Sequence, residues 1–132
     1  MINISNWFLR LAVLYLLAGV SLGLYMAASH NHAMAPVHAH LNLLGWVSMA
    51  LFGLFYRVVP AATGTTLAKV HFWIYVPAHF AQMVLLALLF RGFPAVEPAL
   101  GAVSMLVGAA VVVFAVVVWK HTQTLQQAGL PA

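Results

Sequence analysis

The stretch "PVHAHLNLLGWVSMALFGLFYRVVP", residues 36–60, decides the fold of this chain. It is long and apolar enough to cross the ~30 Å hydrocarbon core of a bilayer, which takes about 20 residues of helix. Two histidines, His38 and His40, stand near its start. Because a polar side chain inside a membrane span is costly, such residues are candidates for function. The first question is therefore what these two imidazoles bind.

The composition predicts an integral membrane protein. Of the 132 residues, 65% are hydrophobic and 5% are charged, whereas a soluble domain carries about 25% charged residues. The five basic residues are scattered along the chain, which argues against nucleic-acid binding, since that needs a clustered basic patch. The absence of cysteine excludes disulfides, Cys-ligated zinc and covalently attached c-type haem. Any cofactor must be held by other ligands, and the seven histidines are the obvious candidates.

Four apolar segments are separated by short loops rich in Pro, Gly, Asn and Thr, which break helices. Each segment is long enough to span a bilayer. Because the loops are short, neighbouring helices should be antiparallel. The sequence therefore predicts an all-α integral membrane four-helix unit that forms a single domain over residues 1–132. The expected spans are residues 7–28, 37–59, 67–90 and 98–119.

The basic residues predict the orientation, because Lys and Arg concentrate on the cytoplasmic side. With both termini inside, Arg10, Arg57, Lys69 and Lys120 are cytoplasmic and only Arg91 is outside. We therefore expect a multi-pass protein of the bacterial inner membrane. His38 and His40, at the start of the second span, should lie toward its periplasmic side.

Aromatic residues near the span ends are typical interfacial anchors. We expect this role for Trp7, Tyr56 and Trp119, and nothing beyond it. In the third span, the sequence favours a packing or hydrogen-bonding role for His71. For His79 we expect a hydrogen bond to a backbone carbonyl that Pro77 leaves free.

The spacing of His38 and His40 restricts what they can bind. Two residues apart on an α-helix, their side chains diverge by about 200°, so they cannot grip one metal ion together. A zinc or copper clamp on a helix needs a spacing of three or four. Haem iron needs only one imidazole from each side of the macrocycle. The alternative is that both histidines bond to carbonyls or lipid headgroups at the interface.

Small side chains follow the histidine pair along the same span. They allow a flat cofactor or another helix to come close, and ordinary helix packing is an equally good explanation. These residues are Gly45, Ser48, Ala50 and Gly53.

The segments "VHAHLNLLGWVSMALFGLFYRVVP" and "LAKVHFWIYVPAHF" resemble the tenth and eleventh helices of subunit I of haem-copper oxidases and of the related cytochrome-type nitric oxide reductases. The likeness covers about residues 30 to 80. It implies that His38 and His40 ligate two different haem irons. It also implies that His30 and, at a looser offset, Arg91 lie near haem propionates.

The chain departs from the family in two ways. It lacks the copper-binding helix with its His-Pro-Glu run, so copper is not expected, although His30 and His32 in the first loop could bind a metal loosely. Its only acid is Glu97, so the carboxylate pathways of proton pumping are absent. We therefore do not expect a proton pump.

The resemblance also suggests an assembly, because the family's subunit I is similar to three arcs of four helices. A homotrimer would rebuild that ring, with His38 of one protomer facing His40 of the next. We expect a b-type cytochrome that binds haem b (heme b) without a covalent link and serves electron transfer or redox sensing. Its electron donor and acceptor are unspecified. The alternatives are a minimal nitric oxide or oxygen reductase with an open haem, and a cofactor-free protein that assists oxidase assembly.

Overall fold

The computed structural model describes residues 3–127, so that residues 1–2 and 128–132 of the expected domain lie outside the described range. The described part is helical and has no strands. Four stretches are long and apolar enough to cross a membrane, namely Ile4–Ser29, Ala35–Val58, Thr66–Phe90 and Pro94–Thr122. The predicted all-α membrane architecture is confirmed, with span ends within a few residues of those expected.

The first and third spans are single α-helices with side-chain caps at their starts. Helix α1 (Ile4–Ser29) begins after Asn3, whose side chain accepts a hydrogen bond from the backbone N–H of Asn6. Helix α5 (Thr66–Phe90) begins after Thr65, whose hydroxyl accepts from the N–H of Ala68. Such caps satisfy backbone donors that the first helical turn leaves without a partner.

The second span is built from three consecutive segments rather than one α-helix. It starts as α2 (Ala35–His40), widens into the π-helix η1 (Leu41–Ser48) and returns to α3 (Met49–Val58). π-Helices are rare and usually limited to one turn. The predicted helical span is therefore present, but residues 41–48 of it form a π-helix, which the sequence did not indicate.

Two side-chain hydroxyl groups, one from α5 and one from η1 itself, donate hydrogen bonds to carbonyls of η1. The hydroxyl of Tyr75 on α5 donates to the carbonyl of Leu44 at 2.9 Å. The hydroxyl of Ser48 donates to the carbonyl of Leu43 at 2.8 Å. These bonds satisfy carbonyls within the widened segment.

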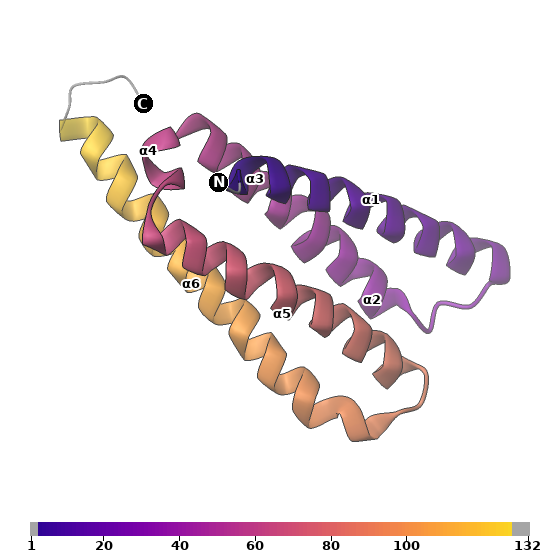
Figure 1. Cartoon of the computed structure of the whole chain (residues 1–132). Coiled ribbons are helices and arrows are strands. Elements are labelled where there is room, and N and C mark those ends of the chain that lie inside the picture. Colours follow the sequence, from indigo (N-terminus) through magenta and orange to yellow (C-terminus); the bar gives the residue numbers. More distant parts are fainter. Residues whose placement is uncertain (1–2, 128–132) are drawn as a thin grey trace.

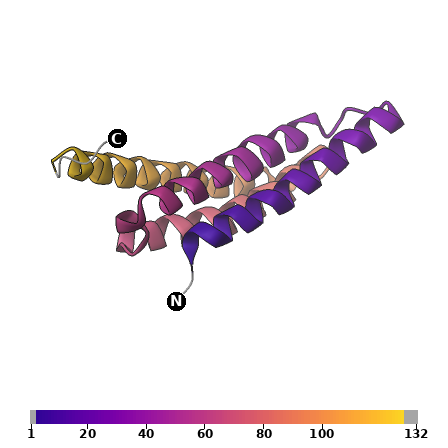
Figure 2. The ribbon, with the colours of Figure 1, turned by 90° about the horizontal axis from the view of Figure 1, so that it is seen from above.

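The helices form two antiparallel hairpins, as Figure 1 shows. Helix α1 pairs with the second span, and α5 pairs with α6 (Glu97–Gln127). The short helix α4 (Pro60–Thr63) connects the hairpins, and the 3₁₀ turn η2 (Pro94–Val96) leads from α5 into α6. Seen from above in Figure 2, α6 crosses α1 at an angle. The start of α1 and the end of α6 lie at the same end of the molecule, near α4.

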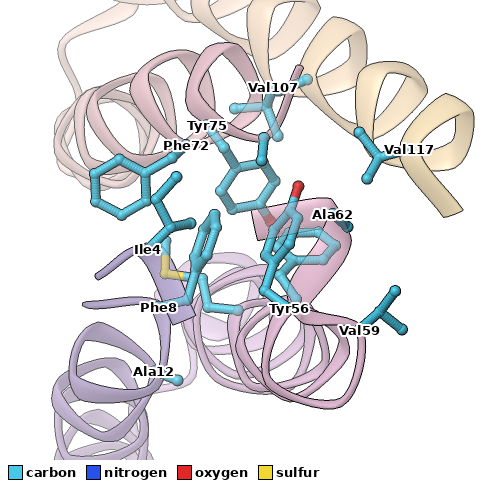
Figure 3. Packing of buried hydrophobic residues seen from close by; sticks show 14 of the residues in the cluster. Ile4, Phe8, Ala12, Tyr56, Val59, Ala62, Phe72, Tyr75, Val107 and Val117 are labelled. Carbon is cyan, nitrogen blue, oxygen red and sulfur yellow. The ribbon is translucent and has the colours of Figure 1, made fainter. Parts of the chain in front are cut away.

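The main core lies near α4, where the two hairpins meet. Side chains from all four spans point toward one another there, as Figure 3 shows. Phe8, Tyr56, Phe72 and Tyr75 supply most of its bulk and are nearly inaccessible. A smaller cluster of Val37, Met83 and Leu86 joins the hairpins toward the opposite end.

Side-chain hydrogen bonds connect the packed helices. Lipid tails are as apolar as the side chains, so the hydrophobic effect does not drive helices together within a bilayer. Hydrogen bonds and close packing hold them together instead. They join Ser5 to the Gly53 carbonyl, His38 to the Gly19 carbonyl, Tyr56 to His71, Tyr75 to the Leu44 carbonyl and Gln82 to Ser104.

Candidate functional site

His38 lies on α2 with its ring turned toward α1. Its Nδ1 lies 2.9 Å from the carbonyl oxygen of Gly19. Because a carbonyl can only accept, Nδ1 must carry the proton and donate. A neutral imidazole in this tautomer has its lone pair on Nε2, the nitrogen that remains for a metal.

Two glycines of α1 make room for this arrangement. A Cβ atom added at Gly23 would lie 2.8 Å from Cε1 of His38, and one added at Gly19 would lie 2.6 Å from Nδ2 of Asn42. Asn42 in turn donates from Nδ2 to the backbone carbonyl of His38 at 2.8 Å. The ring of His38 is therefore held between a glycine face of α1 and a side chain of its own span.

His40 makes a different bond through the same nitrogen. Its Nδ1 lies 2.8 Å from the carbonyl oxygen of Pro36, four residues earlier in its own helix. His40 must therefore also protonate Nδ1 and keep its lone pair on Nε2. The described structure gives neither His38 nor His40 a hydrogen bond at Nε2. Both histidines thus bond to backbone carbonyls, as the alternative to metal ligation predicted. The same arrangement is compatible with metal ligation, because a histidine that ligates a metal almost always donates its other ring N–H to a carbonyl, carboxylate or water.

The two rings occupy opposite flanks of α2. Both lie in its α-helical part, where two residues separate side chains by about 200°. Val37 and Leu41 pack toward Met83 of α5 in the smaller core cluster, with one histidine on either side of them. His38 takes the flank toward α1. One chain thus cannot bring both Nε2 atoms to the same iron.

The small residues of the second span pack against α1. A Cβ atom at Gly45 would lie 2.6 Å from the ring of Tyr15, and one at Gly53 would lie 2.8 Å from Leu9 and 3.1 Å from the backbone of Ser5. Ordinary helix packing, one of the two expectations for this face, therefore accounts for both glycines.

His71 lies inside the main core, where the expected hydrogen-bonding role is confirmed. It is fully buried, and its Nδ1 lies 3.0 Å from the hydroxyl of Tyr56. The rings of Phe8, Phe52 and Phe114 surround it at centroid distances of 4.6 to 5.2 Å. Its Nε2 is buried without a partner.

The role expected for Tyr56 is wrong. Tyr56 is only 1% exposed and so is not an interfacial anchor. Helix α3 turns its ring inward, where the hydroxyl reaches His71 across the two hairpins. Trp7 and Trp119 are exposed, as anchors at an interface would be.

Replacing Tyr56 by Phe should lower the stability of the bundle by about 0.6–2 kcal/mol, the range measured for hydrogen bonds between membrane helices. The change removes the partner of His71 Nδ1 while keeping the ring. Unfolding in mixed micelles measures the effect. Tyr25→Phe is the matched control, because Tyr25 is 63% exposed. Equal stability of the two variants would contradict a stabilising role for the buried bond.

His79 starts a buried polar relay between α5 and α6. It is fully buried, and its Nδ1 lies 3.1 Å from Oε1 of Gln82. Gln82 donates from Nε2 to the hydroxyl of Ser104 at 3.0 Å. The bond expected between His79 and a carbonyl freed by Pro77 is therefore wrong, because a polar side chain one turn later is the closer partner. His79 Nε2, like that of His71, is buried and unpartnered.

The remaining candidates lie in the loops at the α2 end of the molecule. His30 ends α1 with a left-handed backbone, at φ 54°, and His32 follows it in the exposed loop before α2. Arg91 ends α5 and is exposed. Within residues 3–127, no group of three or more His, Cys, Asp or Glu gathers as a metal site.

A groove of about 500 Å³ lies between α1 and α5. Its walls include Leu11, Leu14, Val76 and Phe80, and they expose almost no polar atoms. Neither His38 nor His40 lines it. The groove therefore offers apolar surface but no iron ligand within one chain.

The sequence-based predictions did not include several polar residues inside the spans, among them Asn42, Gln82 and Ser104. The general rule that polar side chains within a span are candidates for function would have identified them. Comparison with protein-family models, curated proteins and solved structures gives no match for this chain.

Proposed function

We propose that this protein is a small membrane b-type cytochrome that binds haem b through His38 and His40 and serves electron transfer or redox sensing. The observation that carries the proposal is the hydrogen bonding of the His38 and His40 imidazole rings. Each binds a carbonyl through Nδ1, which leaves the lone pair of Nε2 unused. Haem held between two such nitrogens supplies a one-electron couple. The likeness of residues 30 to 80 to haem-copper oxidase subunit I supports the same pair.

The second ligand of each iron comes from a second copy of this chain. Since His38 and His40 lie on opposite flanks of α2, one protomer presents one ligand on each side. A closed ring with repeated heterologous interfaces then pairs every His38 with a His40 of the next protomer. The likeness to three arcs of four helices in subunit I favours a homotrimer.

Charge supports an orientation with both termini in the cytoplasm. Arg57 ends α3, Lys69 begins α5 and Lys120 lies near the end of α6, so they share the end near α4. Arg91 lies at the opposite end. The excess of positive charge near α4 favours a cytoplasmic location for that end, with His38 and His40 toward the periplasm. Arg91 and His30, exposed at that end, are then available to haem propionates.

Two imidazole ligands leave an iron without an open position, which suits electron transfer rather than gas chemistry. Purified protein should therefore show the sharp bands of a low-spin b-type cytochrome in a reduced-minus-oxidised spectrum, with no response to CO. A full CO response would instead identify an open haem, as in a minimal nitric oxide or oxygen reductase. Absence of a Soret band in protein from haem-replete cells would overturn both haem functions and favour a cofactor-free assembly protein.

A further inference from the structure

The two proposed ligands are held in unequal ways. His38 bonds to a carbonyl of a different helix, nineteen residues away in sequence. Gly23 and Asn42 flank it, so its ring has little freedom to turn. His40 bonds only within its own helix, to the carbonyl four residues back.

The bond of His40 is a local one that a helical histidine can form without help from a neighbour. His121 shows the same arrangement on α6, with Nδ1 2.8 Å from the carbonyl oxygen of Val117, again four residues back. Rotation of the His40 side chain breaks no hydrogen bond to another helix, although His40 lies within electrostatic range of His79 on α5. Rotation of His38 breaks an interhelical bond and moves its ring away from the glycine face of α1 that it packs on.

We infer that the two ligands have different roles: His38 is the fixed ligand of the haem, and His40 is the exchangeable one. Gly19 and Gly23 are positioning residues for His38. Their missing side chains admit Asn42 and the His38 ring, and the Gly19 carbonyl fixes the tautomer. This inference rests on the proposed function. It adds that haem would stay bound through His38 when His40 is removed, and that a small ligand could then bind on the His40 side.

Glutamine variants test the difference, because glutamine retains a hydrogen-bond donor but is a poor iron ligand. His40→Gln should retain haem, become high-spin and bind CO. Added imidazole should restore its low-spin spectrum. His38→Gln should lose most of its haem, and imidazole should not restore it. Haem content and optical spectra are measured on protein whose helix content and oligomeric state match those of the wild type.

Gly23→Ala tests the positioning role. Its new Cβ would overlap His38, so we expect a reduced haem content or an altered spectrum with His40 unchanged. Gly53→Ala creates a similar overlap with Leu9, far from both histidines, and a Cβ at Gly108 meets nothing within 4 Å. Both controls should keep the wild-type spectrum. A spectral change in Gly53→Ala as large as that in Gly23→Ala would contradict the positioning role.

Failure of the inference and failure of the proposed function give different results. If the wild type carries haem and both glutamine variants lose it equally, or if His38→Gln retains haem and His40→Gln does not, the unequal roles are overturned and haem binding stands. If the wild type carries no haem, the proposed function is overturned and this inference with it.

Discussion

Removing both proposed ligands, by His38→Ala with His40→Ala, should abolish haem binding while leaving the four-helix fold intact. Neither histidine belongs to the main core, which is built from rings nearer α4. The double variant loses one interhelical bond, from His38 to Gly19, and two contacts within the second span, between Asn42 and the ring of His38 and from His40 to Pro36. Its helix content should therefore match that of the wild type, and its Soret band should be absent.

The matched control for the double variant is His71→Gln with His79→Gln. His71 and His79 also lie within a membrane span, but they are buried in the helix bundle, where they bond to Tyr56 and Gln82 respectively. If this control folds, it should keep its haem. Haem bound normally by the His38/His40 variant would show that other residues hold the iron.

Gly45→Leu should destabilise the fold more than any single change discussed so far. Even one added Cβ would lie 2.6 Å from two ring atoms of Tyr15, and a leucine brings three more carbons. Overpacking of this kind costs about 1–3 kcal/mol and sometimes more. Here α1 must also move away from η1, which removes close contact along the first hairpin. Thermal unfolding in detergent measures the loss.

Gly108→Leu is the control for this second prediction. Gly108 also lies within a membrane span, and a Cβ there meets nothing within 4 Å. Leucine at this position should leave the stability unchanged or raise it slightly, since it replaces a residue that weakens helices. If the two leucine variants unfold alike, the close approach of α1 to η1 does not stabilise the protein.

Composition and loop spacing were sufficient to predict the spans, because a bilayer demands long apolar helices whatever their partners. The divergence of His38 and His40 also follows from sequence, since α2 is regular where they lie. Both arguments rely on local geometry alone.

The features that sequence did not predict depend on contacts between distant segments. The π-helix involves a bond from Tyr75, thirty-one residues beyond Leu44. Tyr56 was misplaced because its position near a span end fits an anchor, whereas its direction depends on how α3 packs against α5. The bond between His79 and Gln82 could have been anticipated from their spacing of three on one helix.

The central claim is that each haem iron is held by a His38 and a His40 of neighbouring protomers. Electron paramagnetic resonance of the oxidised, purified protein tests it most directly, when combined with the haem-to-protomer ratio and native mass spectrometry. We expect a low-spin ferric signal from bis-imidazole haem, one haem per chain and a trimeric mass. A high-spin signal, or fully loaded haem in a monomer, would contradict it.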